Sequence, residues 1–208
     1  MQNVIEFFRE GGFVMWPLIL CLIVTIGIVL ERAIAFRRMS RFDPESMLDE
    51  VRDKWSETSG DPKAVIAHLE QENTPFSRMF VKGLKNADKP GDMIDLAMSQ
   101  EASNEIPLLE YYLPGLKTII AIAPLMGLLG TIAGMIFSFK EVAAHGLSSP
   151  TAVMKGVSES LVSTATGIAI AIIALIFYNY FASLVKKFVE DMEYYGAELT
   201  NLLTGRVA

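Results

Sequence analysis

The chain has 208 residues, of which 51% are hydrophobic, and it carries a formal net charge of −6 at pH 7. This acidic balance argues against a nucleic-acid partner, because phosphate backbones attract basic surfaces. The single cysteine, Cys21, excludes an internal disulfide bond, and the sequence has no phosphate-binding loop, nucleophile elbow or dinucleotide fingerprint, so it predicts no enzyme, no cofactor and no metal cluster.

Three apolar runs without a charged residue organise the chain: Phe13–Leu30, Thr118–Phe139 and Ser160–Val185. A helix rises about 1.5 Å per residue, so each run is long enough to cross a bilayer core of about 30 Å. A soluble helix of this length would keep a polar face. We therefore predict an all-α, polytopic membrane protein with three transmembrane helices, the second and third of which are long and extend into the cytoplasm.

The N-terminal part predicts a surface segment followed by the first span. Residues 1–12 have the pattern of a short amphipathic helix on the outer face of the membrane, and residues 13–36 form the first transmembrane helix. This helix is not a cleavable signal, because acidic residues precede it and Glu31-Arg32 follows it. Basic residues after the first and third runs place residues 37–112 and the C-terminus in the cytoplasm.

Residues 37–112 predict a small helical cytoplasmic domain. Three prolines in it follow residues that cap helices well: Asp43-Pro44, Asp61-Pro62 and Thr74-Pro75. Asp92 is expected to cap a longer helix that leads to the second span. We expect a modest core, packed also on the extensions of the second and third spans, from these residues: Val51, Trp55, Val65, Ile66, Leu69, Phe76, Met79, Phe80, Leu84, Ile94 and Leu96.

The second and third transmembrane helices are predicted at residues 113–144 and 150–185, with an outer loop at 145–149 and a cytoplasmic helical tail at 186–208. Ser149-Pro150 repeats the pattern of a cap followed by proline, so the third helix starts before its uncharged run. Both spans carry glycines, which allow helices in a membrane to approach closely. We expect four of them at helix contacts: Gly127, Gly130, Gly134 and Gly167.

Starting the third helix at Pro150 places Glu159 about 14 Å inside it. A carboxyl group within a membrane is costly and faces a helix bundle or water, so Glu159 is a candidate functional residue. Hydroxyl groups follow it on the same helix, at Ser160, Ser163, Thr164 and Thr166. For any single hydroxyl, bonding between helices is the commoner role. The whole set, together with the carboxyl group, favours a hydrated pathway.

These segments resemble a known family. Residues 123–139, A-P-L-M-G-L-L-G-T-I-A-G-M-I-F-S-F, are similar to the signature of the MotA/TolQ/ExbB proton-channel family. Residues 157–172, V-S-E-S-L-V-S-T-A-T-G-I-A-I-A-I, are similar to the last span of that family, and residues 11–20, G-G-F-V-M-W-P-L-I-L, to its first. The resemblance covers all three spans, is closest to the ExbB branch with TolQ next, and implies a three-helix topology with the N-terminus outside.

The resemblance also implies a set of functional residues. Thr131 takes the place of the family's pore threonine in the second span, and Thr164 that of the threonine in the third. Glu159 takes the place of the glutamate that precedes Thr164 in the last span. These three residues are the predicted proton pathway. The family implies a ring of copies, five in ExbB and TolQ, around a single-span partner of the ExbD/TolR type that supplies a membrane aspartate.

The implied function is a stator-like proton-channel subunit of the bacterial inner membrane. Such a subunit converts the proton motive force into work on a TonB-like protein during outer-membrane transport. One alternative is a TolQ-type subunit that works with a TolA-like protein in envelope maintenance, and another is a membrane scaffold that conducts no ions. A transporter with its own substrate site would need inverted repeats or broken helices, which the sequence does not have.

Overall fold

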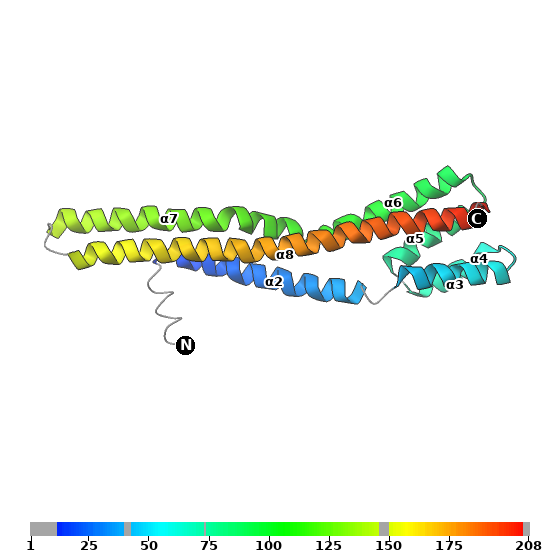
Figure 1. The fold of residues 1–208 in the computed structure, drawn as a ribbon, viewed down its shortest axis with the longest axis horizontal. Helices are drawn as coiled ribbons and strands as arrows, with labels where there is room; N and C mark the ends of the chain where they lie inside the picture. Colours follow the sequence, from blue (N-terminus) through cyan, green and yellow to red (C-terminus); the bar gives the residue numbers. More distant parts are fainter. Residues whose placement is uncertain (1–11, 40–42, 73, 146–149, 206–208) are drawn as a thin grey trace. The chain divides into compact units, whose positions relative to one another are not determined.

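We describe the fold from a computed structural model of the chain (Figure 1), which describes residues 12–39, 43–72, 74–145 and 150–205. The amphipathic segment predicted at 1–12 lies outside these ranges except for Gly12. The loop predicted at 145–149 lies outside them except for His145. In the described ranges every regular element is an α-helix: α2 (Met15–Met39), α3 (Pro44–Glu57), α4 (Pro62–Glu72), α5 (Pro75–Leu84), α6 (Gly91–Glu110), α7 (Leu113–His145) and α8 (Pro150–Thr204).

Three of the described helices, α2, α7 and α8, contain stretches long and apolar enough to cross a membrane. They contain the three uncharged runs of the sequence apart from Phe13 and Val14, so the predicted all-α fold with three spanning helices is confirmed. The helix α8 continues for 55 residues. At the standard rise it is about 82 Å long, so it extends well beyond the apolar core of a bilayer.

The chain divides into two compact units. Unit 1 comprises Met1–Arg32 and Tyr112–Phe181, and it therefore holds most of α2, all of α7, and the first part of α8. Unit 2 comprises Ala33–Tyr111 and Ala182–Ala208. It holds the last part of α2, the helices α3 to α6 and the C-terminal part of α8, so two uninterrupted helices, α2 and α8, contribute to both units.

The cap-plus-proline pattern starts helices where the sequence predicts. Asp43 is the N-cap of α3, and its side chain accepts a hydrogen bond from the Glu45 N–H. Thr74 caps α5 in a capping box with Ser77, whose hydroxyl accepts from the Thr74 N–H. The start of α6 differs from the prediction. Pro90 occupies its N-cap position, and Asp92 lies in the first turn, where a carboxylate suits the positive end of the helix dipole.

Unit 2 has a hydrophobic core that differs in one respect from the predicted one. The prediction of Leu96 as a core residue is wrong, because 51% of it is exposed. Met98, on the neighbouring face of α6, is buried instead. The remaining predicted residues belong to the core, with Trp55 and Ile66 only half-buried. The core also includes residues of α8, as expected for an extension of the third span, so that unit 2 packs around Met192 and Leu199.

A partly buried ion pair joins α5 to α6 inside unit 2. The Arg78 guanidinium donates from Nε and Nη2 to the two carboxylate oxygens of Glu105, both at 2.8 Å. The Glu105 side chain is buried, with 7% of it exposed, and the Arg78 side chain is partly exposed. Hydrogen bonding to Glu105 raises the pKa of Arg78 above its ordinary value, so the guanidinium stays charged. This pair fixes the register of α5 against α6.

Arg78→Met is expected to destabilise the protein by about 2 kcal/mol, because it leaves the Glu105 carboxylate buried without its partner. The figure lies below that for fully buried pairs because water reaches Arg78. Thermal unfolding followed by circular dichroism would measure it. Adding Glu105→Leu should restore much of the loss. Lys82→Met, which removes the longer and more exposed pair with Glu101, is the control and should change stability by less than about 1 kcal/mol. Equal losses in both single variants would contradict this role.

Candidate functional site

The candidate site is built on the contact between α7 and the first part of α8 in unit 1, which run side by side (Figure 1). Small residues line this contact, which we call the α7–α8 seam. A Cβ atom added at Gly127 would lie 2.9 Å from the Thr164 Cα, and one added at Gly167 would lie 3.2 Å from the Gly127 Cα. Because the nearest atoms belong to the backbone, the two helices are in direct main-chain contact at this level.

The seam continues along both helices through serine and glycine. A Cβ at Gly130 would clash with the Ser163 side chain, and a Cβ at Gly134 with the Ser160 hydroxyl. Farther along, Gly156 meets Ser138. Gly156 was not among the predicted packing glycines. Its position four residues before Ser160, within a run of small residues on one helix face, is the signal that could have found it.

The buried serines of the seam hold the two helices together. Ser138, Ser160 and Ser163 are nearly inaccessible to solvent. Each donates to a carbonyl oxygen of its own helix, as Ser160 does to the Gly156 carbonyl at 2.7 Å. On α7, the Ser160 hydroxyl also lies 3.3 Å from the Thr131 carbonyl, and the Ser163 hydroxyl lies 3.5 Å from the Gly127 carbonyl. For Ser160 and Ser163, the geometry therefore supports bonding between helices rather than a place in a hydrated pathway.

Thr131 and Thr164 lie on the edge of the same seam. Both are half-buried. The Thr131 hydroxyl donates to the Leu128 carbonyl at 2.7 Å, within its own helix. The Thr164 hydroxyl donates across the seam to the Gly127 carbonyl at 3.0 Å. Because the Thr131 carbonyl lies beside Ser160, one turn along α8 from Thr164, the two threonines occupy neighbouring levels of the seam.

Glu159 lies near the start of α2. A Cβ atom at Gly12 would lie 3.5 Å from the Glu159 Oε2 atom, and Gly12 has a positive φ of 69° that favours glycine. The first N–H groups of a helix have no partner within the helix, so the negative charge of Glu159 suits this end of α2. Lys155, one turn earlier on α8, places Nζ 4.0 Å from Glu159 Oε1. Sequence reasoning did not predict the contact with Gly12.

The chemistry that the site can perform follows from its groups. A threonine hydroxyl has one donor and two acceptor sites, so Thr131 and Thr164 can still accept a hydrogen bond while each donates to a carbonyl. The acidic residues among the described residues of unit 1 are Glu31, Glu141 and Glu159, with no aspartate. The seam thus offers hydroxyl groups that can hold water or a proton carrier, and the Glu159 carboxyl group lies on the same helix as Thr164, near the start of α2.

A second polar cluster lies in unit 2, where the sequence predicted no metal site. The side chains of Glu50, His68 and Glu72 come together, with one ligand atom of each within 4.8 Å of the others. His68 Nε2 lies 3.1 Å from Glu50 Oε2. The cluster is open to solvent, so water can reach its polar groups. It remains a surface contact between α3 and α4.

Comparison with known proteins identifies the family to which the chain is similar. The model of the MotA/TolQ/ExbB proton channel family matches residues 71–194, which include the seam. A Synechocystis protein named ExbB-like 3 is 32% identical over 177 residues, covering 84% of this chain and 82% of that protein. A Methanothermobacter thermautotrophicus ExbB homolog is 27% identical, covering 92% of this chain and 67% of its own length.

Relatives of the Tol system are similar to this chain over a shorter stretch than these two proteins. The TolQ protein of the Tol-Pal system from Haemophilus influenzae is 29% identical over 138 residues, covering 66% of this chain and 56% of that protein. ExbB therefore stands first and TolQ next, as the resemblance of the spans predicts. With three helices able to span a membrane and a family match over more than half of its length, the chain is a multi-pass membrane protein that belongs to the MotA/TolQ/ExbB proton channel family.

Proposed function

We propose that this chain is the stator-like proton-channel subunit of a complex with an ExbD/TolR-type single-span partner in the bacterial inner membrane. The observation that carries the proposal is the placement of Thr131 and Thr164 at neighbouring levels on the edge of the α7–α8 seam. Both hydroxyls lie where a group outside this subunit can reach them, whereas the serines between the helices are enclosed.

The partner is needed because this chain lacks a complete proton relay. No aspartate lies among the described residues of unit 1, and the threonines cannot ionise at physiological pH. An aspartate on the partner's span would load a proton, move past each subunit's threonines and release the proton on the other side. The membrane potential supplies about 2.3 kcal/mol per charge for each 100 mV, in addition to the pH gradient.

The assembly that fits this mechanism is a ring of five copies around the partner's spans. The positive-inside rule supports an N-terminus in the periplasm and unit 2 in the cytoplasm. The relatives named ExbB-like 3 and ExbB homolog are similar over 84% and 92% of the chain, against 66% for the Haemophilus influenzae TolQ, which favours work on a TonB-like protein over work on a TolA-like protein. The glycines of the seam, Gly127, Gly130, Gly134 and Gly167, pack each subunit's own helices and so present the threonines to the lumen.

The double variant Thr131→Val, Thr164→Val tests the channel directly. Valine keeps the shape of threonine and removes the hydroxyl, so the helices should still pack while the proton path loses both groups. We expect proton flux into liposomes that contain the complex with its partner to fall by about tenfold or more. A pH-sensitive dye inside the liposomes measures the flux, and native mass spectrometry shows whether the ring assembles.

Thr118→Val is the matched control. Thr118 lies on the same helix as Thr131, and its hydroxyl donates to the Pro114 carbonyl at 2.9 Å in the same way. Its replacement should leave the proton flux unchanged. Normal flux in the double variant, with an intact ring, would refute the proton pathway at these threonines and leave the scaffold that conducts no ions as the better account.

A further inference from the structure

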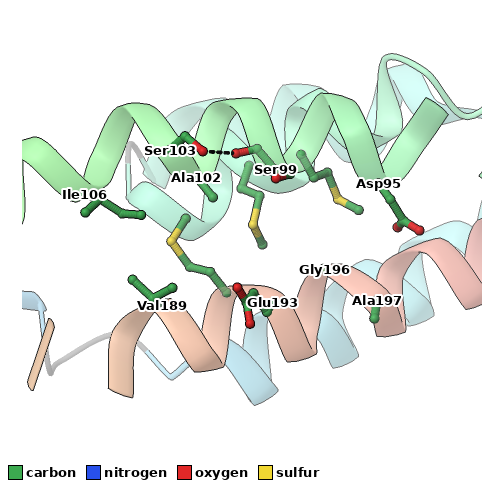
Figure 2. A pocket seen from close by; sticks show the side chains of 12 residues that line it. Asp95, Ser99, Ala102, Ser103, Ile106, Val189, Glu193, Gly196 and Ala197 are labelled. Atoms are coloured by element: carbon green, nitrogen blue, oxygen red, sulfur yellow. Dashed lines mark hydrogen bonds between the residues drawn. The ribbon is translucent and has the colours of Figure 1, made fainter. Parts of the chain in front are cut away.

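Unit 2 contains a cavity of about 220 Å³ between α6 and the C-terminal part of α8. Figure 2 shows side chains from both helices facing each other across it. Three methionines line the cavity, Met79, Met98 and Met192, and each is at most 2% exposed. The cavity is open on one side, because Ser99 and Ala197 line it and are exposed. We call this opening with its lining the α6–α8 groove.

The residues that line the groove differ between its two ends. On α6 its lining residues recur at helical spacing from Asp95 through Ser99 to Ile106, a distance of about 17 Å along the helix axis. Figure 2 shows Ile106 and Val189 together at one end, Asp95 at the other, and Glu193 between them. One end of the groove is thus aliphatic, and the rest of it has an acidic rim.

The size and lining of the groove indicate what can enter it. Sites for small molecules and cofactors occupy roughly 300–1,000 Å³, which is more than this cavity offers. A few inserted side chains fit better. Methionine side chains are flexible and polarizable, and they are over-represented on surfaces that accept the apolar face of a partner helix. The length of the groove along α6 corresponds to about three turns of a helix.

The acidic side chains of the groove indicate the charge that its partner should carry. Asp95 and Glu193 are both exposed, and the Thr200 hydroxyl donates to Asp95 and so orients its carboxylate. Among the described residues neither carboxylate forms a salt bridge, whereas Glu101, Glu105 and Glu190, which do, lie outside the lining of the groove. The acidic rim has no cation of its own in this part of the chain and is complementary to lysine or arginine.

We propose that the α6–α8 groove binds a cationic amphipathic helix of a partner protein. The helix inserts aliphatic side chains over Met79, Met98 and Met192, and its lysine or arginine side chains lie against Asp95 and Glu193. This surface belongs to unit 2 alone and is separate from the threonines of the seam. It gives the subunit a second point of attachment that needs no proton flow.

A designed peptide tests the groove on the full-length protein in nanodiscs of zwitterionic lipid, which do not attract cations. The probe is a fluorescent helical peptide of leucine and lysine with one apolar face, and fluorescence anisotropy measures its binding. Asp95→Asn with Glu193→Gln keeps the side-chain shapes and should weaken binding by about fivefold. Ser99→Phe and Ala197→Phe, which fill the groove from exposed positions, should each weaken it by about tenfold or more.

Glu190→Gln is the matched control, because Glu190 is an acidic residue of α8 outside the groove that pairs with Lys186. It should bind the peptide as the wild type does. Equal binding of a peptide with glutamate in place of lysine would overturn the proposal, as would normal binding to both phenylalanine variants. If the wild type binds neither peptide and Ala197→Phe lowers the number of copies in the oligomer, a second copy of this chain covers the groove and the proposal fails.

Discussion

Gly167→Ala is expected to prevent α7 and α8 from packing, and so to yield little stable protein. A Cβ atom at this position would overlap the Ala123 carbonyl oxygen and crowd the backbone of Gly127. Backbone atoms of a neighbouring helix cannot rotate away as a side chain can, so the helices must separate. Overpacking of this kind costs about 1–3 kcal/mol or more. Size-exclusion chromatography and thermal unfolding in detergent would show aggregation and a lower melting temperature.

Gly27→Ala provides the matched control for this effect. Gly27 lies in the spanning part of α2, and a Cβ atom added there would meet nothing within 4 Å. Alanine is a better helix former than glycine, so this variant should be as stable as the wild type or more stable by up to about 1 kcal/mol. If both alanine variants were equally stable, the close approach at Gly167 would have no energetic importance.

Glu159→Ala and Glu159→Gln should both abolish most of the proton-driven work, while the ring still assembles. Glutamine keeps the size of the side chain and its hydrogen-bonding capacity, but it cannot carry a charge. Because Glu159 lies beside Lys155 and the start of α2, we expect the charge itself to matter. Proton flux in liposomes should fall by about tenfold or more in both variants.

Glu141→Gln is the control for this series, since Glu141 is the other acidic residue of the α7–α8 hairpin among the residues described in unit 1. It should retain normal flux. If Glu159→Gln works and Glu159→Ala does not, the residue has a structural role in hydrogen bonding. Full activity of Glu159→Ala in a normal ring would remove Glu159 from the proposed site altogether.

Local sequence signals predicted helix starts and spanning segments well. A capping side chain and a proline act within one turn, so Asp43-Pro44 and Thr74-Pro75 are sufficient to start α3 and α5. Uncharged runs depend only on composition, so the three long helices could be predicted as well. The start of α6 is the exception, because Pro90 preceded Asp92 and took the N-cap position.

The contacts between distant segments could not be predicted in the same way. Leu96 and Met98 are both apolar and only two residues apart, and Met98 is buried because its face of α6 meets α8. The hydroxyls of α8 look alike in sequence. Their separation into the enclosed Ser160 and Ser163 and the half-buried Thr164 depends on how α8 is rotated against the glycines of α7. The approach of Gly12 to Glu159 joins segments that lie far apart in the sequence.

The division into two units has a practical consequence for spectroscopy. The chain has two tryptophans, and each unit contains one of them. Trp16 is 73% exposed on α2, in a segment able to span a membrane, whereas Trp55 is packed against the core of unit 2. Brominated lipids should therefore quench the emission of Trp16 alone. Replacing either tryptophan with phenylalanine would leave an intrinsic reporter for one unit at a time, without any attached dye.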